Sequence, residues 1–257
     1  MKKFTPITSS LDDMANKIIN LDHLPDRDPD ASNCPHCDGY GHIIDENGKA
    51  RPCVCVRNEI IKSGIEEAHI PVKFKDSTLD SFDPYEFILK QRLGQARQYV
   101  ENYSTDNSKG LFICGTTGTG KTHLAIGILK GLIKRGFDGG FFNVVELLDS
   151  IRSSFDPNAT APPRVRLTQE LERQIIILDD FGVEKTSTWV VDRLYAIINR
   201  RYQDCKTIII TSNIHMDNIA ERVERRLTSR IYDMCDVLDI QAPDFRQKNS
   251  QSQGRRG

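Results

Sequence analysis

The sequence has no excess of charge of either sign, no long apolar run and no internal repeat. Its formal net charge is −1, so any contact with nucleic acid must come from local basic patches rather than from a global field. No segment reaches the roughly 18 uncharged apolar residues that a membrane helix needs. The N-terminus, MKKFTPITSSLDD, has two lysines but no apolar stretch behind them, which does not fit a secretory signal. We therefore expect a cytoplasmic protein whose seven cysteines are reduced or bound to metal.

What the chain has is a globular composition, with 38% hydrophobic and 28% charged residues, and a glycine-rich segment, GLFICGTTGTGKT, at residues 110–122. Leu111 to Cys114 predict a short buried strand, and the next eight residues have the G-x-x-x-x-G-K-[ST] spacing of a phosphate-binding loop. Glycines let backbone N–H groups approach phosphate oxygens, and the following helix points its positive dipole end at the anion. The alternative is a simple glycine turn. The predicted ATP-binding residues are Gly115, Thr116, Thr117, Gly118, Thr119, Gly120, Lys121 and Thr122.

Two of these side chains have separate chemical tasks. Lys121 reaches the β- and γ-phosphates, and the Thr122 hydroxyl is a ligand for Mg²⁺. The run IIILDD predicts a strand buried on both faces, with Asp179 and Asp180 at its C-terminal end, where open α/β sheets bind ligands. This Walker B pattern assigns Asp179 to Mg²⁺ and Asp180 to polarising the attacking water. The strand predicted at 207–211 brings Asn213 beside these acids if it lies between the other two strands.

Four cysteines near the N-terminus have the spacing of a metal site. Cys34 and Cys37 form one close pair, and Cys53 and Cys55 follow after fifteen intervening residues. Two such pairs predict one structural Zn²⁺ held by four thiolates, because a segment this small has too little core to fold alone. Disulfides and free thiols are the alternatives, and His36 or His42 could replace a cysteine. The three other cysteines, Cys114, Cys205 and Cys235, are expected to be small core residues.

Several segments are predicted from periodicity alone. Residues 9–20 place apolar side chains on one helical face, which either packs on its own domain or docks on a partner. A short helix is predicted near 59–67, a strand at 140–145, one arginine-rich helix at 216–234 and a last strand at 237–240. The helix at 164–173 carries Arg164, Arg166 and Arg173, which form a solvated face or contact a phosphate backbone.

The phrases CPHCDGYG with PCVC, GTTGTGKTHLA, ILDDFGVEK, IIITSN and RRLTSRIYDMCDVL resemble bacterial helicase loaders of the DnaC/DnaI type over nearly the whole chain. These loaders are a branch of the AAA+ ATPases that also includes the transposition-helper ATPases of the IstB type. The resemblance implies an α/β fold, a five-stranded parallel sheet flanked by helices, after a small zinc-binding domain. It suggests a helicase-interaction region at 1–60, a linker at 61–84, an AAA+ domain at 85–246 and a disordered tail at 247–257.

The resemblance also implies residue roles that spacing does not give. Asn213 matches the sensor-1 asparagine, which orients water and senses the γ-phosphate, and Arg230 matches an arginine finger supplied to a neighbouring subunit. Arg246 matches the sensor-2 arginine of the nucleotide site, and residues 150–173 fall where this branch carries helices associated with single-stranded DNA. Many AAA+ proteins have Asp-Glu at Walker B, whereas this chain has Asp179-Asp180, which suits a slow switch better than a motor.

The resemblance therefore implies an ATP-dependent loader that hydrolyses ATP, binds a replicative ring helicase through its N-terminal region and delivers it onto single-stranded DNA. Self-association in the ATP state is expected, and no membrane is involved. A transposition helper is an alternative, although such proteins usually lack the cysteine module. A non-enzymatic zinc adaptor is another, although Asp180, Asn213 and Arg230 together argue against it. A small-molecule P-loop kinase is not favoured, because the strand that carries Asn213 and the arginine finger would then have no role.

Overall fold

The computed structural model describes residues 34–44, 50–106, 109–154, 164–182, 187–221 and 223–245. The helix predicted at 9–20, Arg222, Arg246 and the polar tail lie outside these ranges. Among the helices of the described part, none combines the length and apolar character that a membrane span requires.

The centre of the fold is a five-stranded parallel sheet with the order β4-β5-β6-β3-β7. Its strands are β3 (Gly110–Gly115), β4 (Gly139–Asn143), β5 (Ile175–Asp179), β6 (Thr207–Ser212) and β7 (Cys235–Ile240). The predicted parallel sheet of five strands is confirmed, and β6 lies between β5 and β3, as the position of Asn213 required. The carboxyl ends of β3, β5 and β6 consequently meet at one edge.

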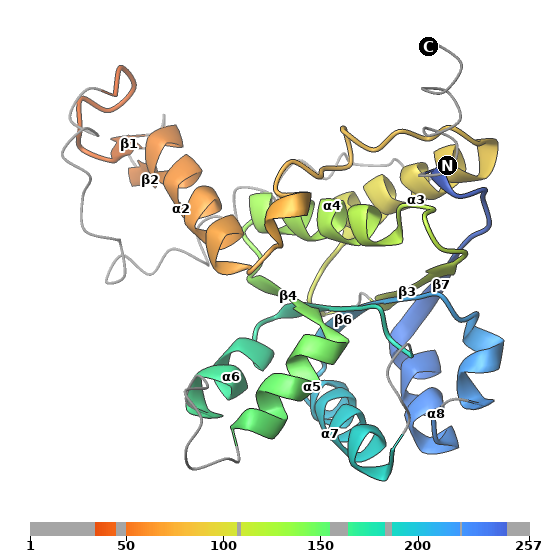
Figure 1. The fold of residues 1–257 in the computed structure, drawn as a ribbon. Coiled ribbons are helices and arrows are strands. Elements are labelled where there is room, and N and C mark those ends of the chain that lie inside the picture. The colour runs from red at the N-terminus through yellow and green to blue at the C-terminus, as the bar shows by residue number, and fades with distance from the viewer. Residues whose placement is uncertain are drawn as a thin grey trace, which may run out of the picture.

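Helices cover both faces of the sheet, which gives three layers (Figure 1). One layer contains α3 (Phe87–Asn102) and α4 (Lys121–Lys134), and the other contains α5 (Val144–Ser153), α6 (Arg164–Leu171), α7 (Thr188–Gln203) and α8 (Arg225–Met234). Alternate residues of β5 belong to different cores: Ile177 packs on the α4 side, and Ile176 and Leu178 pack on the α7 side. The uninterrupted apolar strands of the sequence are explained by this double burial.

Several predicted boundaries were wrong: α6 ends at Leu171 and β7 begins at Cys235, and three further differences have a structural reason. Strand β4 ends at Asn143, because the Asn143 side chain caps α5 by accepting from the N–H groups of Val145 (3.1 Å) and Glu146 (3.3 Å). The helix predicted at 216–234 is divided into the 3₁₀ helix η4 (Met216–Glu221) and α8, because Glu224 has an extended backbone (φ −61°, ψ 148°). The helix predicted near 59–67 is α2 (Val54–Glu67), whose first turn closes on the Cys53 carbonyl.

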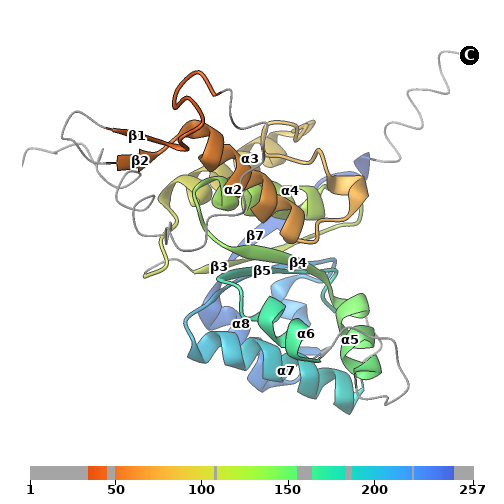
Figure 2. The same cartoon turned by 90° about the vertical axis from the view of Figure 1, so that its left-hand side faces the viewer.

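The N-terminal part of the described chain is a small module that continues into the core. Strands β1 (His42–Ile44) and β2 (Ala50–Pro52) form an antiparallel hairpin, and α2 leads from it to α4 (Figure 2). The contact is close, because a Cβ on Gly64 would lie 3.1 Å from Ile133. After α2, Ala68 and Phe82 are buried in the α4-side core, with the short helix η3 (Val72–Phe74) between them. Part of the segment interpreted as a linker therefore packs on the sheet domain, and the domain boundaries stay a prediction.

Candidate nucleotide site and cysteine cluster

The predicted phosphate-binding loop joins the buried strand β3 to helix α4. Gly115, Gly118 and Gly120 have φ values of 145°, 78° and 89°, in the region that glycine adopts without strain. At Gly115 the backbone of β7 also passes so close that a Cβ would lie 1.9 Å from the Ile240 carbonyl oxygen. Helix α4 begins at Lys121, directly after the loop, so its first N–H groups face the loop.

Lys121 is almost fully buried inside this loop, with 6% of its surface exposed. Its ammonium group donates to the carbonyl oxygens of Gly115 (3.0 Å) and Thr116 (2.8 Å). The positive charge is thus held within the ring of loop backbone groups, where a phosphate would be bound.

Oxygen atoms suited to Mg²⁺ converge beside the loop. Asp179 Oδ1 accepts hydrogen bonds from the hydroxyls of Thr122 (2.9 Å) and Thr211 (2.7 Å). Burial raises the pKa of Asp179 despite the hydrogen bonds from the two hydroxyls. Adjacent ligands of an octahedral Mg²⁺ with bonds of about 2.0–2.1 Å lie about 2.9 Å apart, which matches the separation of Thr122 Oγ1 and Asp179 Oδ1. The residues fit the ion.

Thr211 is a site residue that the sequence reasoning missed. It lies on β6 beside Asp179, and its hydroxyl also accepts the backbone N–H of Asp180 at 3.0 Å. The signal was present, because a threonine that follows the apolar run Ile208–Ile210 points toward the same face as Ile209, the face covered by α4. Asp180 has a left-handed backbone (φ 59°), and Asn213 is exposed directly after β6. Both lie at the loop's edge of the sheet, and their roles stay predictions.

Arg230 lies at the opposite edge of the sheet. It belongs to α8, which ends at Met234 immediately before β7, and β7 runs parallel to β3 toward the loop. The six residues of β7 span about 17–20 Å at about 3.3 Å per residue, so Arg230 cannot reach the loop of its own chain. Its guanidinium instead lies over the ring of Tyr202, 4.2 Å from the centroid.

The predicted cysteine cluster is assembled. Cys34 and Cys53 have sulfur atoms 3.7 Å apart, and those of Cys37 and Cys55 are 3.6 Å apart. Tetrahedral Zn²⁺ with Zn–S bonds of about 2.3 Å places its ligands about 3.8 Å apart, whereas a disulfide would need about 2.05 Å. The Gly41 N–H donates to the Cys37 sulfur at 3.3 Å, as in a tight metal-binding turn. The thiols fit zinc, and neither His36 nor His42 joins the cluster that the described residues form.

A family model described as IstB-like ATP binding protein matches residues 61–253, about three quarters of the chain. The chain belongs to the IstB-like ATP binding protein family. The resemblance to helicase loaders is also confirmed, because the crystal structure of the DnaC helicase loader superposes with a TM-score of 0.60 at 30% identity, over 66% of this chain and 99% of that one. The fold is therefore that of an AAA+ nucleotide-binding protein. The cysteine cluster lies N-terminal to the region that the family model matches.

Curated relatives are more distant. The chain is 26% identical over 212 residues to the uncharacterized protein YqaM of Bacillus subtilis (strain 168), covering 78% of this chain and 66% of that protein. It is 25% identical over 139 residues to the replicative helicase loader DnaC of Escherichia coli (strain K12), covering 54% and 56%. The chain thus spans about half to two thirds of these relatives.

In this IstB-like protein the segment Ala242–Phe245, which follows β7, lies over the phosphate-binding loop. The Thr116 hydroxyl donates to the Ala242 carbonyl (2.8 Å), and the Phe245 N–H donates to the Gly118 carbonyl (3.1 Å). The Asp244 carboxylate lies against Gly118, where a Cβ would meet Asp244 Oδ1 at 1.9 Å. We call Ala242–Phe245 the loop-covering segment. The residues 242–245 do not themselves signal a contact with a distant glycine loop, although the resemblance placed the next residue, Arg246, at the nucleotide site.

The charge of Asp244 opposes a bound triphosphate. Asp244→Asn is expected to tighten ATP binding by about threefold to tenfold, because one negative charge a few ångströms from phosphate is worth on the order of 1 kcal/mol near solvent. ATP affinity measured by calorimetry checks this. Asp236→Asn, at the exposed far end of β7, is the matched control and should leave the affinity unchanged. Weaker ATP binding by Asp244→Asn would show that the carboxylate supports the loop instead.

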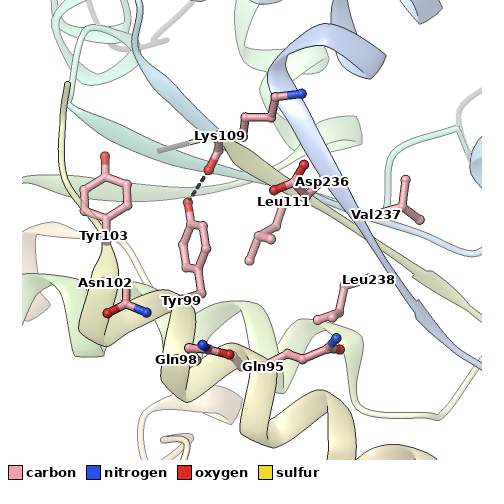
Figure 3. A pocket seen from close by; sticks show the side chains of 11 residues that line it. Gln95, Gln98, Tyr99, Asn102, Tyr103, Lys109, Leu111, Asp236, Val237 and Leu238 are labelled. Atoms are coloured by element: carbon pink, nitrogen blue, oxygen red, sulfur yellow. Dashed lines mark hydrogen bonds between the residues drawn. The ribbon is translucent and has the colours of Figure 1, made fainter. Parts of the chain in front are cut away.

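A groove with a volume of about 370 Å³ is drawn in Figure 3. The groove lies between α3 and the edge strand β7. The Tyr99 side chain lies in it, and its hydroxyl donates to the Lys109 carbonyl at 2.8 Å. Lys109 and Asp236 mark the amino ends of β3 and β7, so the groove is separate from the nucleotide site.

Proposed function

We propose that the chain is an ATP-dependent loader that holds a replicative ring helicase and delivers it onto single-stranded DNA. The observation that carries the proposal is the separation of parts within one chain. The phosphate loop and Arg230 lie at opposite edges of the sheet, and the cysteine module lies outside the family domain. These parts can act together in loading if ATP binding assembles the subunits while the cysteine module holds the helicase.

The first part of the proposal is ATP hydrolysis. Lys121 binds the β- and γ-phosphates, and Thr122 with Asp179 would hold Mg²⁺, which neutralises charge on the same phosphates when bound. Asp180 polarises the attacking water and Asn213 orients it. Thr211 positions both acids, since its hydroxyl donates to Asp179 and accepts from the Asp180 backbone. Arg246 contacts the nucleotide as a sensor, next to the loop-covering segment.

The second part is a structural zinc ion in the N-terminal module. Cys34, Cys37, Cys53 and Cys55 hold it, and it fixes the hairpin β1–β2 against the start of α2. The module presents apolar side chains that its own small core does not cover. Tyr40 is 67% exposed, Ile43 41% and Ile44 64%, which suits a protein-binding surface. We assign helicase binding to this module, together with the residues before it.

The third part is DNA binding by α6. Arg164 and Arg166 lie at the start of this helix, and their side chains are outside the described structure. Arg173 is not available for DNA, because it pairs with Asp138 (2.7 Å) and Glu170 (2.8 Å) and is only 13% exposed. Neither interpretation offered for Arg173 from the sequence holds. Backbone-directed binding through a few arginines should weaken steeply with salt and show little sequence preference.

One experiment tests the loader as a whole. Affinity for single-stranded DNA is measured with ATP, ADP and no nucleotide at two salt concentrations, and capture of a bacterial replicative helicase is measured in parallel. We expect ATP to strengthen DNA binding. The double variant Ile43→Asp/Ile44→Asp should lose helicase capture and keep ATP-dependent DNA binding. Val72→Asp, at an 88% exposed residue outside the module, is the control that should keep both.

Two outcomes would remove the proposal. Equal DNA affinity in all nucleotide states would leave an ATPase without coupling to DNA. Undiminished helicase capture by the Ile43/Ile44 variant would remove the module as the binding surface. A transposition-helper ATPase, the second candidate, is favoured by the family match and would show DNA binding without any helicase capture.

Arg230 is expected to act on the ATP of a neighbouring subunit. Arg230→Ala should slow hydrolysis by about 1,000-fold or more, because an arginine finger stabilises transition-state charge. Mixing Arg230→Ala with Lys121→Ala should restore part of the activity, since each chain supplies what the other lacks. Arg226→Ala, a neighbour on α8 that stacks on Tyr195, is the matched control. A monomeric Arg230→Ala protein with full activity contradicts the role.

A further inference from the structure

A second group of metal-ligand side chains gathers at the carboxyl edge of the sheet. Cys114 ends the buried part of β3, and Asp239 is its partner across the ladder to β7. His215 follows β6. The Cys114 sulfur lies 3.7 Å from Asp239 Oδ1, and His215 Nε2 lies 3.8 Å from Asp239 Oδ2. All three ligand atoms lie within 4.8 Å of one another.

This group is separate from the Mg²⁺ residues because it occupies the other face of the sheet. Asp179 and Thr211 follow the alternation of Ile177 and Ile209, which pack toward α4. Cys114 packs in the core on the α7 and α8 side, and Asp239 lies between Leu238 and Ile240, which both point toward the α4 side. The sheet therefore separates the two groups.

The histidine is held in the orientation that a metal ligand needs. His215 Nδ1 lies 3.2 Å from Asp217 Oδ2 and accepts the Asp217 backbone N–H at 3.4 Å, so this side of the ring is held at Asp217 and Nε2 faces Cys114 and Asp239. Metal-binding histidines are usually fixed by a carboxylate in this way. Asp239 is fixed as well, since its backbone carbonyl accepts from Arg92 Nε at 2.7 Å.

We propose that Cys114, His215 and Asp239 bind a second divalent cation of the zinc class, with water as the fourth ligand. Ligand atoms of a tetrahedral zinc site lie about 3.3–3.8 Å apart, close to the two separations above. A thiolate, an imidazole and one carboxylate favour Zn²⁺ over Mg²⁺ or Ca²⁺, which take oxygen ligands. The side chains of His215 and Asp239 are 37% and 27% exposed, so the ion and its water enter from solvent. The thiol proton leaves to solvent on binding.

The position gives the site a consequence for the nucleotide loop. Cys114 directly precedes Gly115, His215 follows two residues after Asn213, and β7 continues into the loop-covering segment. A bound ion cross-links the ends of three neighbouring chain segments around the loop. Because it binds only the folded chain, it should raise the Tm as its concentration increases.

Co²⁺ is the probe, because thiolate ligation gives it a charge-transfer absorption band. The full chain is first loaded with one equivalent of Zn²⁺ at the four-cysteine cluster, and Co²⁺ is then titrated. We expect one further Co²⁺ per chain with a thiolate band. Cys114→Ser should abolish the band, and His215→Gln should weaken Co²⁺ binding at least tenfold. Cys235→Ser, at the opposite end of β7, is the matched control and should retain both.

Cys114→Ser and His215→Gln test the proposal independently, so it can still be refuted if the Cys114 variant disturbs the core. His215 is partly exposed, so its replacement is not expected to affect folding, and far-ultraviolet circular dichroism checks this for both variants. Absence of a Co²⁺–thiolate band in the zinc-loaded chain overturns the proposal. A band that persists unchanged in Cys114→Ser, or an unchanged Co²⁺ affinity in His215→Gln, overturns it as well. Zn²⁺ that raises the Tm of the zinc-loaded wild-type chain and not of His215→Gln supports it independently.

Discussion

Lys121→Ala is expected to lower ATP affinity at least about 100-fold, because charge-assisted hydrogen bonds to two phosphates are lost from a loop shaped to bind them. The ammonium already lies inside the loop, held by the carbonyls of Gly115 and Thr116, so wild-type binding requires only a short movement of this side chain. Calorimetry or a fluorescent ATP analogue measures the affinity.

Two controls isolate the loop contact. Lys134→Ala removes an exposed lysine at the end of the same helix and should leave ATP affinity unchanged. Asp180→Asn keeps the loop intact, so it should retain ATP binding and lose turnover. If the Lys121→Ala protein binds ATP as tightly as the wild type, the loop is not the phosphate site.

Cys37→Ser is expected to release one equivalent of zinc per chain and to loosen residues 34–55 without unfolding the sheet domain. Two pairs of the four sulfur atoms already lie at tetrahedral separations. Since β1 and β2 have only three residues each, we expect the module to depend on the metal for its structure. The apolar cores around β3 to β7 include none of the four cysteines, so the sheet domain should stay folded without the metal.

Elemental analysis and limited proteolysis measure these effects. Cys205→Ser, at an exposed cysteine, is the control that should keep its zinc and its proteolysis pattern. This exposure also corrects the expectation that Cys205 is a core residue. Its backbone has a φ of 52° in the turn between α7 and β6, so the side chain points away from the core that Cys114 and Cys235 enter. Reduced wild-type protein without zinc would contradict the metal assignment.

The sequence predicted the parts of the site that obey local rules. Loop glycines, Lys121 and the acids after β5 are specified by short motifs, and parallel strands bring their carboxyl ends to one edge, so Asp179 meets Thr122 as expected. Thr211 was missed because no short motif marks it, although its place after the apolar run of β6 signals the face it occupies. The loop-covering segment was missed because it contacts the glycine loop from a part of the chain that has no phosphate-binding motif. At Asn143 a local rule was overlooked. The β-branched residues after Asn143 favoured a longer strand, but the Asn143 side chain caps helix α5 and ends the strand there.

The placement of Arg230 limits how many copies can be active at once. If each guanidinium serves the next chain, the contact between chains joins two different surfaces, and such head-to-tail contacts produce either closed rings or open helical stacks. In a ring every site receives a finger. In an open stack, the terminal chain at one end holds ATP that no partner completes, and its counterpart at the other end presents an unused Arg230. The two ends of an open stack therefore differ. The chain at one end cannot hydrolyse its ATP and stays in the ATP-bound form, so that end would be the place where subunits are added or released.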